Sequence, residues 1–277
     1  MFWNILRMEG GKTLKRPFFW LSLLIIAVLI AFFYGMFFIF RANVPKSAAA
    51  ILYWPFGLIY GLDSVVGYTP YTSYGAFLLI VLIGVVTGQE YQWRTLQLWL
   101  SHGVPRSALL SAKFLFMLLP ACIIVAVCML VNGGESLVFS SLAHIPSRTL
   151  DGGQLVLSYL RTLYATLPYI ALTFLLIVMG RSTAFAVGAG IAGLAIVETV
   201  LSLIFPIFGA PFARVVQFLP SSLAAALNTH NYALASAAIP HTPLQATTVQ
   251  AVLGIACYVV LFTGLAFWRF QRQDLAN

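Results

Sequence analysis

The chain has 277 residues, of which 61% are hydrophobic and only 8% are charged. A soluble domain usually carries about 25% charged residues, so this chain has too little charge to cover a surface that faces water. The composition therefore predicts a protein whose solvent is largely the hydrocarbon of a membrane. The net charge of +8 does not indicate nucleic-acid binding, because the basic residues flank apolar runs, as in the cytoplasmic loops of membrane proteins.

Six apolar runs are long enough to cross a membrane, which takes roughly 20 residues in a helix. We expect the spans at residues 17–40, 71–89, 108–131, 159–180, 182–205 and 247–268. Pro17 suits the start of the first span, because a proline at the first position of a helix loses no backbone hydrogen bond. The predicted fold is an all-α membrane protein with six transmembrane helices in a single domain, residues 1–277.

The segments between the spans have their own patterns. Residues 1–16 are basic and amphipathic, which predicts a helix lying in the membrane interface before the first span. The stretches 41–70, 132–158 and 206–246 are interrupted by proline and glycine and are interpreted as long loops, the first with a short interfacial helix. Only Arg181 and its neighbours separate the fourth and fifth spans, so these two should form a tight hairpin.

The basic residues also predict the orientation of the chain. With the N-terminus inside, ten of them fall on the cytoplasmic side: Arg7, Lys12, Lys15, Arg16, Arg94, Arg106, Lys113, Arg181, Arg269 and Arg272. The other five fall outside: Arg41, Lys46, Arg148, Arg161 and Arg214. Because cytoplasmic loops carry the excess of basic residues, we expect a multi-pass protein of the plasma (inner) membrane with both termini in the cytoplasm.

The polar segment between the second and third spans has the features of a short amphipathic helix. Glu90 and Arg94 are four residues apart, so they can pair on one face of a helix. Gly103 is a natural end for this helix, and Pro105 prevents its continuation. Arg106 then starts the return into the bilayer. The spacing alone fits a specialised helix at the cytoplasmic surface and an ordinary amphipathic loop helix equally well.

The residues of this segment resemble the conserved stretch of ABC-2 type permeases, the membrane subunits of ABC exporters. The matching positions are Glu90, Arg94-Thr95, Leu100-Ser101, Gly103-Val104-Pro105-Arg106 and Lys113. Arg94 departs from the pattern, since the family often has glycine there. The basic start of the chain resembles the interfacial elbow helix of the family through Glu9, Lys12, Lys15 and Arg16.

The resemblance implies a mechanism and a set of partners. Two permease subunits, identical or different, would pair in the lipid, and each would be bound by a separate ABC ATP-binding subunit. The elbow helix and the surface of Glu90, Arg94, Thr95, Gly103, Pro105 and Arg106 would receive the motion of that subunit. The chain lacks the phosphate-binding pattern Gly-x-x-x-x-Gly-Lys-Ser/Thr, so we expect no enzymatic activity of its own, and ATP and Mg²⁺ in the partner.

Glu198 stands out because it lies within the fifth predicted span, where a carboxylate is costly unless it faces a partner or a water-filled path. One interpretation makes it a contact for substrate or a proton, or a lock between subunits. The other is a carboxylate near the outer interface that is hydrogen-bonded to a loop. No spacing of histidine and cysteine fits a metal site, so no metal or cofactor is expected in this chain.

Two further functions remain open from the sequence. The chain could be a mechanical coupler that passes ATPase motion to an outer partner docked on the loops 132–158 and 206–246, without moving a solute. An intramembrane enzyme would need paired acids, metal ligands or a Ser/His arrangement within the spans, and the spans show no such set.

Overall fold

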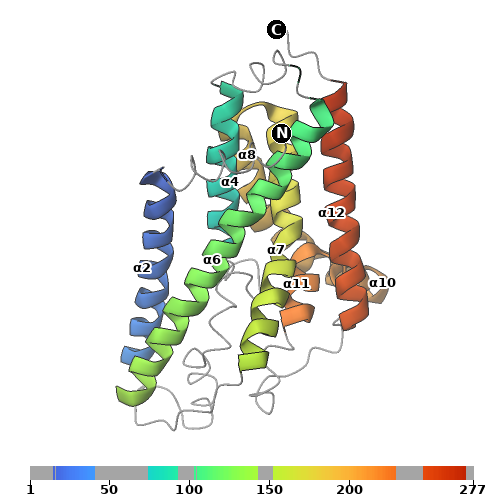
Figure 1. Ribbon diagram of the computed structural model, residues 1–277. Coiled ribbons are helices and arrows are strands. Elements are labelled where there is room, and N and C mark those ends of the chain that lie inside the picture. Colours follow the sequence, from blue (N-terminus) through green and yellow to red (C-terminus); the bar gives the residue numbers. More distant parts are fainter. Residues whose placement is uncertain are drawn as a thin grey trace.

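The computed structural model describes residues 15, 17–40, 74–92, 103, 105–142, 152–228 and 246–272, and this part of the chain is helical, without β-strands (Figure 1). The elements are α2 (Pro17–Phe40), α4 (Tyr74–Gln92), α6 (Arg106–Leu142), α7 (Gly152–Gly180), α8 (Thr183–Ala192), the π-helical turn η5 (Gly193–Val197), α9 (Glu198–Ile204), the 3₁₀ turn η6 (Phe205–Phe208), α10 (Ala210–Val216), α11 (Pro220–Asn228) and α12 (Thr248–Gln271).

The helices form a bundle in which α2, α4, α6 and α7 alternate in direction, whereas α12 runs in the same direction as α7 (Figure 1). Helices α2 and α6 lie side by side at one edge, α12 packs on α7, and α8 packs on α4 and α7. The start of α6 and the ends of α4, α7 and α12 meet at the upper end of the bundle in Figure 1. These helix ends belong to segments that the charge distribution assigns to the cytoplasm.

Three of the described helices are long and apolar enough to cross a membrane: Arg106–Glu135, Leu155–Gly180 and Thr248–Gln271. Helices α10 and α11 would make a fourth if the pair, bent by 71°, counts as one broken span. Shorter apolar helices cover Pro17–Phe32, Ala76–Val85, Thr183–Ala192 and Glu198–Phe208. The expected all-α class is thus confirmed for the described residues, and the number of six spans stays a prediction.

Two predicted loops are corrected by the structure. In the range 132–158, α6 continues to Leu142 and α7 already begins at Gly152. The glycines at 133 and 134 do not break α6, because a glycine inside a helix costs only about 1 kcal/mol, which packing can offset. In the range 206–246, residues 210–216 and 220–228 are helical, because Pro211 and Pro220 stand at helix starts, where proline is tolerated.

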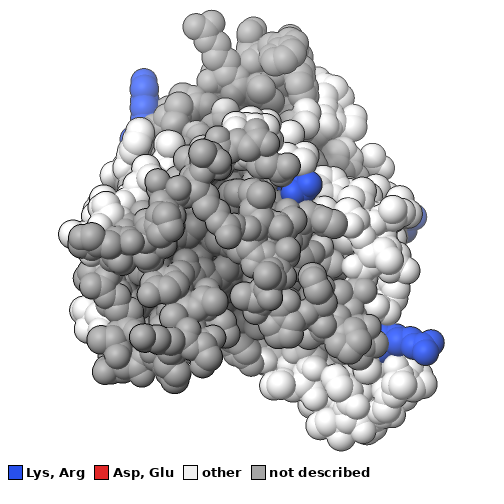
Figure 2. Space-filling model, turned by 90° about the horizontal axis from the view of Figure 1, so that it is seen from below, with Lys and Arg blue, Asp and Glu red and all other residues white. Residues whose placement is uncertain are grey.

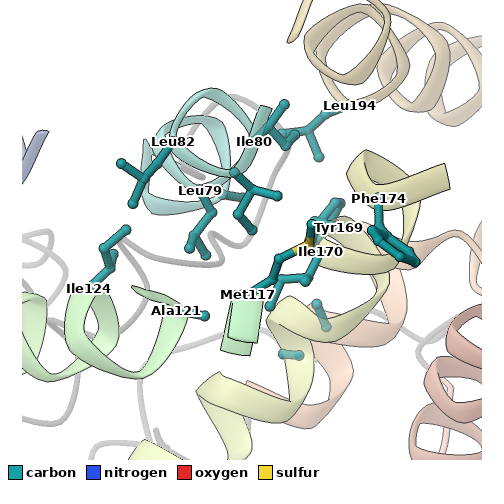
Figure 3. Packing of buried hydrophobic residues seen from close by; sticks show 14 of the residues in the cluster. Leu79, Ile80, Leu82, Met117, Ala121, Ile124, Tyr169, Ile170, Phe174 and Leu194 are labelled. Atoms are coloured by element: carbon teal, nitrogen blue, oxygen red, sulfur yellow. The ribbon is translucent and has the colours of Figure 1, made fainter. Parts of the chain in front are cut away.

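The apolar core has its centre between α4, α6 and α7, with Leu194 of η5 beside it, and extends to α2, α11 and α12 (Figure 3). Three sets of side chains meet there: Leu79, Ile80 and Leu82 of α4; Met117, Ala121 and Ile124 of α6; and Tyr169, Ile170 and Phe174 of α7. Phe114 of α6 adds a ring contact with Phe174, with centroids 5.4 Å apart.

Helices α4 and α8 approach each other through small residues. A Cβ atom on Gly88 would lie 2.8 Å from the Thr183 Cα, and one on Gly190 would lie 2.7 Å from the Ile80 Cγ2. Between membrane helices the lipid supplies no hydrophobic drive, so close packing of this kind is a main source of stability.

Candidate functional site

Arg106 joins two long helices at the upper end of the bundle. It is the first residue of α6, and its Nη1 donates hydrogen bonds to the carbonyl oxygens of Gln271, at 3.1 Å, and Phe270, at 3.5 Å. Both acceptors lie in the last turn of α12, where carbonyl groups have no partner within the helix and the helix dipole favours a cation. The start of α6 is therefore tied to the end of α12.

The residues just before Arg106 set the direction in which α6 begins. Gly103 is exposed and has a φ of +78°, a left-handed conformation that favours glycine. Pro105 is also exposed, and its carbonyl oxygen accepts the backbone N–H of Leu109 at 3.1 Å, which closes the first turn of α6. The structure thus places Gly103, Pro105 and Arg106 together in one turn.

The remaining residues of the predicted coupling surface are less fully described. Glu90 lies in the last turn of α4, whereas Arg94 and Thr95 lie outside the described residues. Of the predicted elbow helix, Lys15 is described and exposed, and Glu9, Lys12 and Arg16 lie outside the described part of the chain. The amphipathic helix after the second span and the elbow helix accordingly stay predictions.

The structure adds exposed basic residues at the same end of the bundle. Arg181 lies in the turn between α7 and α8 with a φ of 49°, and its N–H donates to the Ile177 carbonyl at 2.9 Å. Arg272 follows α12, and its guanidinium lies 4.6 Å from the centre of the Trp268 ring. The sequence signal for both was their charge beside an apolar run, which predicts their side of the membrane.

The opposite end of the molecule looks different. Figure 2 shows it with a few isolated Lys and Arg side chains and with no Asp or Glu visible among the described residues. The exposed part of this view that belongs to described residues is mostly uncharged. At the upper end of the bundle, Arg181 in the turn after α7 and Arg269 and Arg272 at the end of α12 are exposed.

Glu198 marks a second candidate site, deep in the bundle. It is the first residue of α9 and follows the π-helical turn η5, in which its N–H donates to the Gly193 carbonyl. The sequence predicted a span over 182–205, and the structure adds that the helical segment there contains one π-helical turn. A π-helical turn changes the direction in which later side chains point and occurs often at functional sites.

The carboxylate of Glu198 is only 7% exposed and accepts the backbone N–H of Ser221 at 3.0 Å. Ser221 lies in the first turn of α11, where backbone N–H groups have no partner within the helix. Glu198 is thus hydrogen-bonded to α11, a helix within the range that the sequence assigned to an outer loop. The structure favours an intramolecular role in holding α11.

Two phenol groups lie close to this carboxylate. Tyr169 of α7 and Tyr258 of α12 both interact electrostatically with Glu198. The Tyr258 hydroxyl donates to the Phe218 carbonyl at 3.1 Å, whereas the buried hydroxyls of Tyr169 and Thr199 have no hydrogen-bond partner among the described residues. Sequence reasoning missed both tyrosines, because each comes from a helix far along the chain from Glu198. Within the described residues, no group of His, Cys, Asp and Glu could hold a metal ion.

These features define the class of the molecule: an integral membrane protein built from several apolar helices, with exposed arginines at the helix ends of one side. The chain belongs to the ABC-2 family transporter proteins, whose family model matches residues 3–275. This match confirms the resemblance found in the sequence.

One curated protein is also similar to a large part of the chain. The chain is 24% identical over 218 residues to the "Uncharacterized protein YhcI" of Bacillus subtilis (strain 168). The aligned region covers 73% of this chain and 65% of the relative, so the chain spans about two thirds of the relative's length.

Proposed function

We propose that the chain is the membrane-spanning permease subunit of an ATP-driven ABC-2 type exporter. A separate ATP-binding subunit hydrolyses ATP, and this chain converts the resulting motion into movement of a substrate across the membrane. The observation that carries the proposal is the family match over residues 3–275, on a chain whose described part is a bundle of apolar helices. A second permease subunit, identical or different, completes the pathway in the membrane.

The geometry at the upper end of the bundle supports this role. Because Arg106 joins the start of α6 to the end of α12, a push on the turn before α6 displaces both long helices together. Two-state transitions of transporters commonly arise from such rigid-body shifts of packed helices. The exposed basic residues at the same end support its assignment to the cytoplasm, where ATP and Mg²⁺ are available to the partner subunit.

The test is to purify the tagged chain from native membranes in mild detergent and to identify the proteins that copurify with it. We expect a stoichiometric ATP-binding protein that contains a phosphate-binding loop. Recovery of the chain alone in every detergent tried would contradict the proposal. If an ATPase binds but the reconstituted complex moves no solute while a second protein binds its outer face, the mechanical coupler becomes the better explanation.

Arg106→Ala should reduce recovery of the ATP-binding subunit by about tenfold or more. The reason is that hydrogen bonds to a charged group contribute roughly 1.5–3 kcal/mol, and their loss frees the turn before α6 from α12. Arg106→Lys keeps the charge but loses the planar guanidinium, whose Nη1 donates to both carbonyls. Its recovery of the ATP-binding subunit should therefore lie between that of Arg106→Ala and that of the wild type. The measurement is the molar ratio of the two subunits after purification, by quantitative mass spectrometry.

Glu90→Ala should also reduce recovery of the ATP-binding subunit, since Glu90, in the last turn of α4, belongs to the predicted contact surface. The matched control is Arg214→Ala, which removes an exposed arginine from α10, in the other half of the bundle. It should leave the ratio unchanged. Equal losses for Arg106→Ala and Arg214→Ala would show that any lost arginine weakens the complex, and the contact surface would then lie elsewhere.

A further inference from the structure

The bend between α10 and α11 exposes backbone groups that a continuous helix would pair. The chain turns by 71° between Val216 and Pro220. Pro220 has no N–H, so the bend leaves no donor unpaired at that position. The N–H of Ser221 and the carbonyl of Phe218 lie on either side of it. The Ser221 N–H lies at a buried position, where a backbone group without a partner costs free energy, whereas the Phe218 carbonyl lies on the exposed side of the bend.

Two side chains from different helices provide these partners. Glu198, at the start of α9, accepts the Ser221 N–H at 3.0 Å, and Tyr258, in the middle of α12, donates its hydroxyl to the Phe218 carbonyl at 3.1 Å. The carboxylate also faces the positive end of the α11 dipole, which strengthens the contact in surroundings of low dielectric constant. The bend is therefore held from both sides by its own neighbours.

The two arms of the bend differ in their surroundings. Helix α11 is packed into the bundle, with Ser221 and residues 223–228 buried, and a Cβ atom on Gly254 of α12 would lie 2.7 Å from the Leu223 Cδ1. Helix α10 presents Phe212 and Val215 on the surface, and Phe218 is exposed at the bend. The two hydrogen bonds thus lie where a surface helix passes into a buried one.

We propose that Glu198 and Tyr258 form a single clasp that fixes the bend between α10 and α11, so that α11 shifts only together with α9 and α12. Removing either hydrogen bond releases the same bend, because the remaining contact holds only one side of it. The clasp does not depend on the ATP-binding partner, so it can hold even if the proposed function is wrong.

Hydrogen exchange of the full chain in lipid nanodiscs, read by mass spectrometry, tests the clasp at the amides of residues 221–224. These amides should exchange slowly in the wild type and about tenfold faster in Glu198→Ala and in Tyr258→Phe, the change expected when a helix loses its cap. Glu198→Gln keeps an acceptor oxygen without the charge and should show a smaller increase. It also serves as the test variant if Glu198→Ala does not fold.

Two controls separate the clasp from general loosening. Tyr164→Phe removes another tyrosine hydrogen bond to α12, from the Tyr164 hydroxyl to the Val252 carbonyl at 2.8 Å, and should leave residues 221–224 at the wild-type rate. Glu135→Gln changes a second glutamate of an apolar helix and should do the same. If the amides of residues 221–224 exchange as fast in either control variant as in Tyr258→Phe, the proposal is overturned.

The double variant Glu198→Gln/Tyr258→Phe decides whether the two contacts act as one. For a single clasp, exchange in the double variant should equal that of the faster single variant, because one loss already frees the bend. Fully additive effects would show two independent contacts and overturn the clasp. Fast exchange of the same amides in the wild type would overturn it as well.

Discussion

Gly88→Ala should lower the stability of the protein by about 3 kcal/mol, the upper part of the range for overpacking a tight interface. The new Cβ would lie 2.8 Å from the Thr183 Cα and 3.0 Å from its Cβ, on the facing helix α8. These atoms belong to or adjoin the backbone, so no flexible side chain can move aside. Helices α4 and α8 must then separate, and the packing that holds α4 to the bundle is lost. Thermal unfolding in a single detergent, followed by intrinsic fluorescence, measures the effect.

Gly264→Ala is the matched control for this substitution. Gly264 lies within α12, and a Cβ atom there would have no heavy atom within 4 Å. Because alanine is the better helix former by about 1 kcal/mol, this variant should unfold at the wild-type temperature or slightly above it. If Gly88→Ala behaves like Gly264→Ala, helices α4 and α8 do not approach as closely as the structure indicates.

Phe174→Ala should lower stability by about 2 kcal/mol. In soluble proteins such a change costs about 3–5 kcal/mol, and part of that is transfer from water, which does not act between a helix and lipid. The cavity and the lost contacts remain, because Phe174 is 1% exposed and packs on Phe114 at a centroid distance of 5.4 Å. Chemical unfolding of the purified chain in mixed micelles provides the measurement.

Phe208→Ala removes the same side chain from a surface position and serves as the comparison. Phe208 is 65% exposed and contacts the Phe212 ring at a centroid distance of 5.9 Å. Its loss should change the unfolding free energy by less than about 0.5 kcal/mol. Equal destabilisation by the two substitutions would contradict the position of the core between α4, α6 and α7.

The elements that the sequence predicts best are those with local signals at their ends. Pro17 and the apolar run after it placed the first span at 17–40, and the structure has α2 at Pro17–Phe40. The start of α12 follows from Thr247, whose side chain accepts from the Gln250 N–H while the Gln250 side chain accepts from the Thr247 N–H. This reciprocal capping depends on residues three apart, so a short window of sequence contains it.

The features that the sequence did not predict depend on contacts between distant residues. Proline and glycine between 206 and 228 have the same local signature in a loop and at helix starts, and packing on distant helices distinguishes the two for α11, which lies against α7 and α12. The sequence indicated that the carboxylate of Glu198 needs a partner within its span. That partner, Ser221, lies 23 residues further on, in a segment that the sequence assigned to a loop. The Arg106 contacts span 164 and 165 residues, a separation at which single-sequence patterns carry no information.

The hydrogen bond between Tyr258 and Phe218, 40 residues apart, has a consequence for biosynthesis. A ribosome adds about 5–20 residues per second, so roughly 2 to 8 seconds pass between the synthesis of Phe218 and that of Tyr258. During that interval helices α8 and α9 and the bend between α10 and α11 exist without α12. The nascent bend can be completed only when the last long helix joins the bundle. A chain stopped before Tyr258 would therefore present an unfinished helix pair to membrane quality control.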